Sequence, residues 1–167
     1  MRHHIRPFIA RHEPPGRLIS HLKSGSGAVI GMTAVGGLAA ITGWPLLIAP
    51  FGATAVLVFG VSASPLAQPI NVIGGYLLAA IVGAAAAAAF PGVCWAAGAA
   101  VGVAIALMLM LRVTHPPAGA IPLIAAASPL EPMMLFLAVL IGSTSLVALA
   151  FLHHRIPPRQ EYPRRLD

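Results

Sequence analysis

The stretch SGSGAVIGMTAVGGLAAITG (residues 24–43) opens a run of 88 residues, Ser24 to Leu111, without a single Asp, Glu, Lys, Arg or His. Nine of the ten Lys and Arg residues lie outside residues 24–152, in two short tails. A soluble domain needs charged side chains on its surface, and this run has none. Several of its apolar segments are long enough to cross a bilayer. The sequence therefore predicts an all-α polytopic integral membrane protein.

Length and composition narrow this prediction to one small helical bundle. The chain has 167 residues, of which 58% are hydrophobic and 8% are charged, so it leaves no room for a separate soluble enzyme domain. Two glycine pairs, Gly27-x-x-x-Gly31 and Gly98-x-x-x-Gly102, have the spacing that lets membrane helices pack closely. The net charge is +6, and the basic residues lie on both sides of the apolar body. This placement favours anionic lipid headgroups over nucleic acid as partners.

The basic residues also predict the domain organisation. Residues 1–23 and 153–167 are expected to be cytoplasmic tails around a transmembrane domain at 24–152, with an even number of crossings. Within the first tail, Arg17–Lys23 is expected to form a short amphipathic turn at the interface. The pairs His3-His4 and His153-His154 are expected on solvated tails, so no metal site is predicted.

Six apolar segments lie between the tails. Four are long enough to span the bilayer and two are short; the long ones are 25–43, 71–90, 93–111 and 133–152, and the short ones are 46–62 and 115–128. Prolines interrupt the second short segment, which predicts a broken or re-entrant helix that neighbouring helices must support.

The two short segments resemble each other. Pro50-Phe-Gly-Ala corresponds to Pro117-Ala-Gly-Ala, and Ser64-Pro-Leu corresponds to Ser128-Pro-Leu. This similarity predicts two pseudo-repeats, about 25–90 and 93–152, each a long, a short and a long helix. Six crossings would give two halves of opposite orientation, and re-entrant short segments would give four crossings. Interrupted helices in matching positions point to a substrate pathway.

Catalytic chemistry is poorly supported by the residues available. The chain has four acidic residues, Glu13, Glu131, Glu161 and Asp167, and no pair of them is placed for acid–base catalysis. We therefore expect neither an enzyme nor a bound cofactor.

The run Thr114-His115-Pro116-Pro117-Ala118-Gly119 is the chemically distinctive part of the body. His115 is the only histidine of residues 24–152, and ionisable groups inside a membrane segment are functional candidates. Proline favours the first turn of a helix, and Thr114 is a candidate N-cap. A helix start at membrane depth would present unpaired amides and the positive end of its dipole to an anion.

The first short segment offers a second helix start of the same kind. Pro50 and Gly52 open it, and Thr54 adds a hydroxyl. Two such starts meeting near the midplane would form an electropositive site for a small anion. Two residues have alternative roles. His115 either binds the anion or has a structural role, in which it caps a helix or forms a hydrogen bond with a backbone carbonyl. Asn71 binds substrate or satisfies loop backbone.

The Thr114–Ala120 run resembles the signature of the HPP family of integral membrane proteins, and residues 49–75 extend this similarity. The resemblance implies four membrane helices. It also implies a role in nitrite transport, because plant plastid members of the family are associated with that activity. His115, Pro116 and Pro117 are the positions that carry the motif.

These observations predict a transporter or channel for a small inorganic anion, with nitrite as the leading candidate, in the bacterial inner membrane. The alternative is a non-transporting sensor or assembly module. Self-association is expected in either case, because irregular backbone at membrane depth has to be covered by protein.

Overall fold

The computed structural model of the protein describes residues 9–11, 15–127 and 130–165. Regular structure in these residues is helical, and none of them forms a strand. Three helices are long and apolar enough to span a bilayer: α2 (Leu18–Thr42), α4 (Pro69–Ala89) and α7 (Pro132–His154). The predicted all-α membrane bundle is confirmed.

Two boundaries differ from the sequence-based expectation. Helix α2 begins at Leu18, so the stretch predicted as a separate amphipathic turn forms its first turns. Helix α5 (Cys94–Met110) has 17 residues and is shorter than the other long helices. At 1.5 Å per residue it measures about 26 Å, against about 30 Å of bilayer hydrocarbon.

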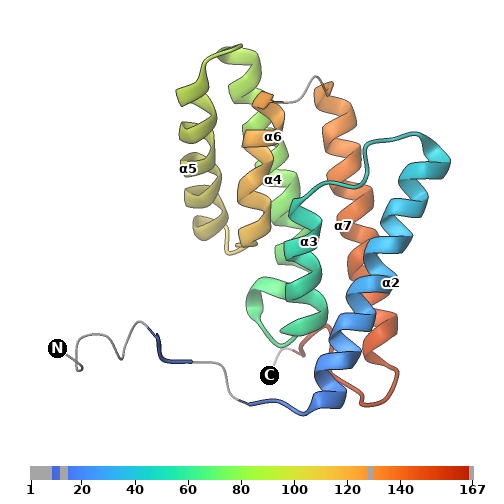
Figure 1. The fold of residues 1–167 in the computed structure, drawn as a ribbon. Helices are drawn as coiled ribbons and strands as arrows, with labels where there is room; N and C mark the ends of the chain where they lie inside the picture. Colours follow the sequence, from blue (N-terminus) through green and yellow to red (C-terminus); the bar gives the residue numbers. More distant parts are fainter. Residues whose placement is uncertain (1–8, 12–14, 128–129, 166–167) are drawn as a thin grey trace.

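Both short segments form short helices that run in opposite directions (Figure 1). Helix α3 (Pro50–Ala55) continues through the π-helical turn η1 (Val56–Gly60) toward the end of the bundle where α2 begins and α7 finishes, here called the tail end. The 3₁₀ turn η3 (Pro116–Ala120) continues as α6 (Ile121–Ala127) toward the opposite, far end.

The duplication itself stays a prediction, because Ser128 and Pro129 of its second copy lie outside the described residues. Residues 1–8 and 12–14 of the expected N-terminal tail also lie outside the described residues.

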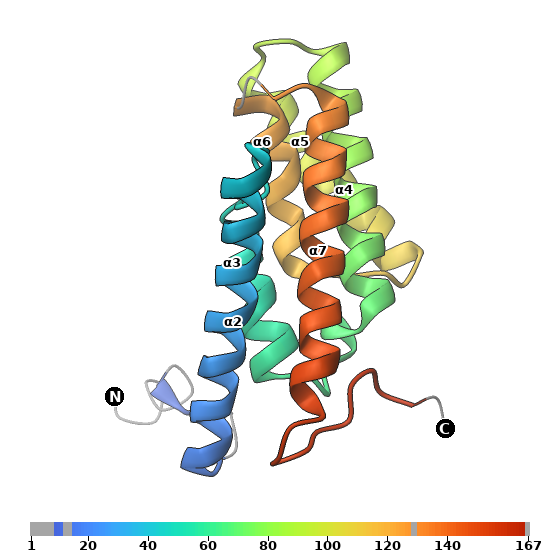
Figure 2. The same ribbon diagram turned by 90° about the vertical axis from the view of Figure 1, so that its right-hand side faces the viewer.

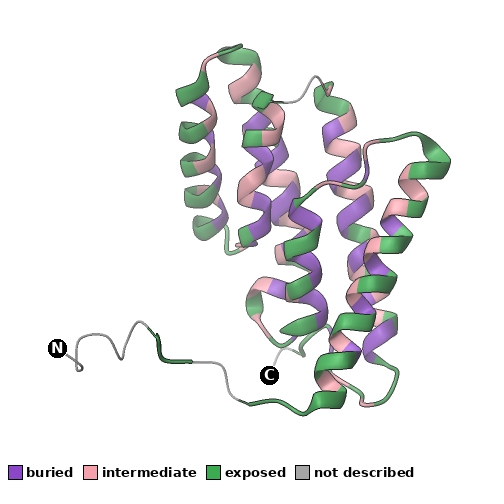
Figure 3. Ribbon diagram, viewed as in Figure 1, coloured by how far each residue is buried: buried purple, intermediate pink, exposed green. Residues whose placement is uncertain are grey.

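The two predicted glycine pairs differ in what they pack against. Cβ atoms added at Gly27 and Gly31 of α2 would meet the Phe59 ring of η1 within 3 Å, so this pair packs helices as predicted. Cβ atoms added at Gly98 and Gly102 of α5 would meet nothing within 4 Å. The second glycine pair therefore faces away from the bundle, on the exposed side of α5 (Figure 3).

The C-terminal segment after α7 folds back across the tail end (Figure 2). The Lys23 ammonium donates to the carbonyls of Ile156 and Pro158, each at 2.6 Å. The Tyr162 hydroxyl donates to the Ala67 carbonyl at 3.0 Å, in the 3₁₀ turn η2 (Pro65–Ala67). Burial raises the pKa of Tyr162, so its hydroxyl remains a donor. These contacts fasten the segment to α2 and η2.

Helix α7 approaches α3 so closely at Gly142 that an added Cβ would overlap the Phe51 ring. We expect Gly142→Ala to lower the free energy of unfolding by about 1–3 kcal/mol, the usual cost of overpacking. Gly98→Ala is the matched control, because it has open space and gains helix propensity. Thermal unfolding of the two variants in detergent measures the difference, and equal melting temperatures would contradict the packing described here.

Lys23 holds the C-terminal segment through two backbone carbonyls. Lys23→Met keeps the length of the side chain and removes the donors, so trypsin should cleave after Arg159 several-fold faster than in the parent protein. Arg17→Met, at an exposed position, removes one charge from the same end of α2 and serves as the control. Cleavage at the same rate in both variants would show that Lys23 does not fasten the segment.

Candidate functional site

The two short helical segments meet in the middle of the bundle, through the fifth residue of α3 and the N-cap of η3. Thr54 of α3 and His115, the N-cap of η3, are 61 residues apart in sequence, yet Thr54 Oγ1 lies 2.9 Å from His115 Nε2. From this contact α3 leads to the tail end and α6 to the far end (Figure 1). The structure thus brings together Thr54 and His115, two of the residues predicted for the site.

Tyr76 of α4 joins these residues in a chain of hydrogen bonds. Its hydroxyl lies 2.7 Å from Thr54 Oγ1, and His115 Nδ1 lies 2.8 Å from the Leu66 carbonyl of η2. A carbonyl only accepts, so Nδ1 carries the hydrogen and donates to it. In the neutral ring Nε2 then accepts from Thr54, which in turn accepts from Tyr76. We call Tyr76, Thr54 and His115 the buried triad.

The triad is sealed from its surroundings. Each of its three side chains has 0% exposed surface, and every polar atom among them has a partner. Phe51 contacts Tyr76 edge-on at a ring distance of 5.2 Å, and an added Cβ at Gly75 would come within 2.9 Å of His115 Cβ. Close packing on both sides therefore fixes the rings.

The helix-start amides are arranged differently from the sequence-based expectation. The backbone N–H groups of Phe51 and Gly52 donate to the carbonyls of Ile48 and Ala49. The N–H of Ala118 donates to the backbone carbonyl of His115. Turns of the 3₁₀ type pair amides that a regular α-helix start would leave free. The polar groups where the two short helices meet are therefore mainly the hydroxyls and the imidazole, and not free backbone amides.

Thr114 and Asn71 hold the loop before the His-Pro-Pro motif. The Thr114 hydroxyl donates to the Met108 carbonyl at 3.3 Å, so it closes the end of α5 and does not cap η3 as predicted. Asn71 Nδ2 donates to the Thr114 carbonyl at 3.1 Å. Of the two alternatives for Asn71, the structure places it on loop backbone.

The remaining predicted residues border the meeting point. Pro50 and Pro117 are buried, Pro116 and Gly52 are exposed, and Gly119 is half-buried. Cβ atoms added at either glycine would meet nothing within 4 Å, so both glycines face away from the triad.

Sequence reasoning missed Tyr76. It is the only tyrosine in residues 24–152, in a helix whose one other polar side chain is Asn71, and that isolation was the available signal. It also misplaced His153 and His154, which were expected on a solvated tail and instead lie buried in the last turn of α7. The helix continues past the last apolar residue because Val58 and Lys23 offer carbonyl partners to the two rings.

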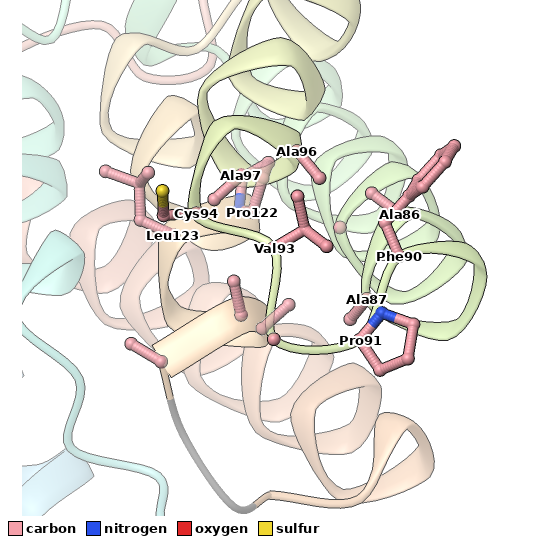
Figure 4. Close-up of a pocket in the computed structure, with 15 residues that line it drawn as sticks. Ala86, Ala87, Phe90, Pro91, Val93, Cys94, Ala96, Ala97, Pro122 and Leu123 are labelled. Carbon is pink, nitrogen blue, oxygen red and sulfur yellow. The ribbon is translucent and has the colours of Figure 1, made fainter.

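A cavity of about 560 Å³ lies near the far end, among α4, α5 and α6 (Figure 4). Small apolar side chains line most of it, together with Pro122 and Cys94. It borders the helix that leads from the triad to the far end. The triad itself does not line it, so the structure is closed at the meeting point of the short helices.

Comparison with known proteins identifies the family. The model of the HPP transmembrane region matches residues 13–163. Two transmembrane proteins of Dictyostelium discoideum are 32% and 33% identical over 126 and 125 residues, covering 71% and 70% of this chain. Those stretches are 44% and 40% of the relatives' own lengths, so this chain spans less than half of either. No solved structure matches. The chain belongs to the HPP family of transmembrane proteins.

Proposed function

We propose that the protein is a transporter or channel for a small inorganic anion, and that nitrite is its substrate. The family and the long apolar helices are consistent with a transmembrane transport role. The observation that carries the proposal is the buried triad, because it joins Thr54, inside α3, to His115, the N-cap of η3. Interrupted helices that meet inside a bundle are a common substrate-site architecture in membrane transporters.

The triad supplies suitable groups for an anion once its internal hydrogen bonds open. The hydroxyls of Tyr76 and Thr54 then turn to donate to the anion in place of lost water. A bare anion buried in apolar protein costs several kcal/mol, so the neutral His115 ring takes up a proton with it. When the anion leaves, the hydrogen bonds between the three side chains form again and seal the path.

We also propose a bacterial inner-membrane location with both tails on the cytoplasmic side. Support comes from the distribution of charge, because nine of the ten Lys and Arg residues lie in the two tails, and α2 begins and α7 finishes at the same end of the bundle.

The second candidate function, a non-transporting sensor or assembly module, is favoured by one feature. Every polar atom of the triad is satisfied within the protein, which is also what a purely structural polar contact requires. Anion flux separates the two functions.

Thr54→Val keeps the shape of the side chain and leaves the Tyr76 hydroxyl and His115 Nε2 facing a methyl group. We expect nitrite uptake into proteoliposomes to fall at least about tenfold, equivalent to ~1.4 kcal/mol of barrier. Stability should also fall by about 1–3 kcal/mol for each unmet polar group, so folding is checked by thermal unfolding. Thr42→Val, at an exposed position at the end of α2, is the matched control.

A panel of nitrite, nitrate, formate and chloride fluxes decides among the outcomes. Uptake of none of these by the parent protein would refute transport and support the sensor function. Normal uptake by a folded Thr54→Val protein would remove the triad from the pathway.

A further inference from the structure

The base of the C-terminal segment contains a buried histidine whose chemistry the buried triad does not use. His154 is 2% exposed, and its Nε2 lies 2.7 Å from the Val58 carbonyl in η1. Its Nδ1 has no partner, and no other buried side-chain nitrogen or oxygen in the described part of the chain shares that condition. A buried polar atom without a partner costs about 1–3 kcal/mol, so its presence calls for a physical reason.

The hydrogen bond to Val58 determines the state of the ring. The carbonyl accepts, so Nε2 carries the hydrogen and Nδ1 of the neutral ring has a bare lone pair. Such an atom repels an anion. It binds one only after gaining a proton, or when the anion arrives already protonated.

Positive charge lies beside this ring. A hollow of about 340 Å³ is lined by His154, Arg155, Arg159 and Gln160. The Arg155 guanidinium stacks on the Phe151 ring at 3.9 Å, and Arg159 is exposed. Glu161, the nearest carboxylate in sequence, pairs with Arg165. Across the described residues neither Arg155 nor Arg159 forms an ion pair, so both charges remain available to a ligand.

The hollow lies close to the path suggested by the triad. Val58, which holds His154, comes four residues after Thr54 on the same continuous helical segment. Four residues correspond to about 6 Å along a helix. The Val58 carbonyl that holds His154 therefore lies roughly one helical turn beyond Thr54, on the tail side.

We propose that Arg155, Arg159 and Nδ1 of His154 form a second binding site, which takes one small weak-acid anion together with one proton. The arginines attract the anion, and the proton converts Nδ1 from a bare acceptor into a donor. The bond that forms is Nδ1–H to an anion oxygen, and Nε2–H keeps its bond to Val58. The inference deepens the proposed transport function, since it adds a tail-side station for the same class of substrate.

The surroundings of the ring explain why proton and anion bind together. Lys23 of α2 and His153 of α7 lie near enough to act on it electrostatically, and Tyr162 contacts it at a ring distance of 5.4 Å. Arg155 and Arg159, which line the same hollow, add two further charged groups on this side. The cations among them oppose a proton on its own, and an anion offsets that opposition.

Isothermal titration of the detergent-solubilised full chain with sodium nitrite and sodium formate tests the site. Titrations at pH about 7.5 in two buffers of different ionisation enthalpy report the protons taken up. The expected result is one proton for each anion, with affinity weakening up to about tenfold for each unit rise in pH. Binding without proton uptake, or no binding of either anion, would overturn the proposal.

His154→Gln separates the proton from the fold. The glutamine amide can still donate to Val58 and offers no base at the place of Nδ1, so proton uptake should vanish and affinity should fall about tenfold or more. His153→Gln is the matched control, because the neighbouring ring makes the same kind of bond, to the Lys23 carbonyl at 3.0 Å. Unchanged uptake in His154→Gln would place the proton elsewhere.

Arg159→Gln changes an exposed side chain, so it tests the site even if His154→Gln fails to fold. Weaker anion binding with one proton still taken up supports the proposal, and unchanged affinity contradicts it. Thr54→Val should bind anion and proton normally while losing flux. Binding in a parent protein that transports nothing would refute transport and leave this site standing.

Discussion

The 2.9 Å hydrogen bond between Thr54 and His115 ties together the two halves of this bundle. Each of the short helices starts inside the protein, where lipid and neighbouring helices offer no water to satisfy polar groups. A polar side chain buried there needs a protein partner, and Thr54 of α3 and the N-cap His115 of η3 are partners of each other. Tyr76 and the Leu66 carbonyl complete the chain, so four separate segments depend on one set of bonds.

Packing around that set is built from glycines against rings. Gly75 admits His115, Gly142 admits Phe51, and Gly27 and Gly31 admit Phe59. In a membrane the hydrophobic effect does not draw helices together, so close approach and dispersion contacts have to do so. Rings held this tightly keep the triad dry. Single side chains have little room to rotate, so the triad can open only if the short helices move.

The tail end depends on a different kind of contact. Lys23, Tyr162 and the two histidines at the end of α7 all bind backbone carbonyls of distant segments. The Tyr162 partner, Ala67, directly follows Leu66, which accepts from His115. The C-terminal segment and the triad thus both bind the same short turn, through the neighbouring carbonyls of Leu66 and Ala67, so displacement of one bears on the other.

Features that depend on neighbouring residues could be predicted from the sequence, and contacts between distant residues could not. The charge-free run, the lengths of the apolar segments and the proline-marked helix starts are local properties, and they determined an all-helical membrane bundle with two short helices. Pairings across 22, 61 or 96 residues, such as Thr54 with Tyr76, Thr54 with His115 and Val58 with His154, leave no local pattern. Only the tertiary structure decided which carbonyls pair with helix-start amides, which glycine pair packs and that His154 is buried. In each case the deciding factor was which group comes within hydrogen-bond or van der Waals reach once the helices are assembled.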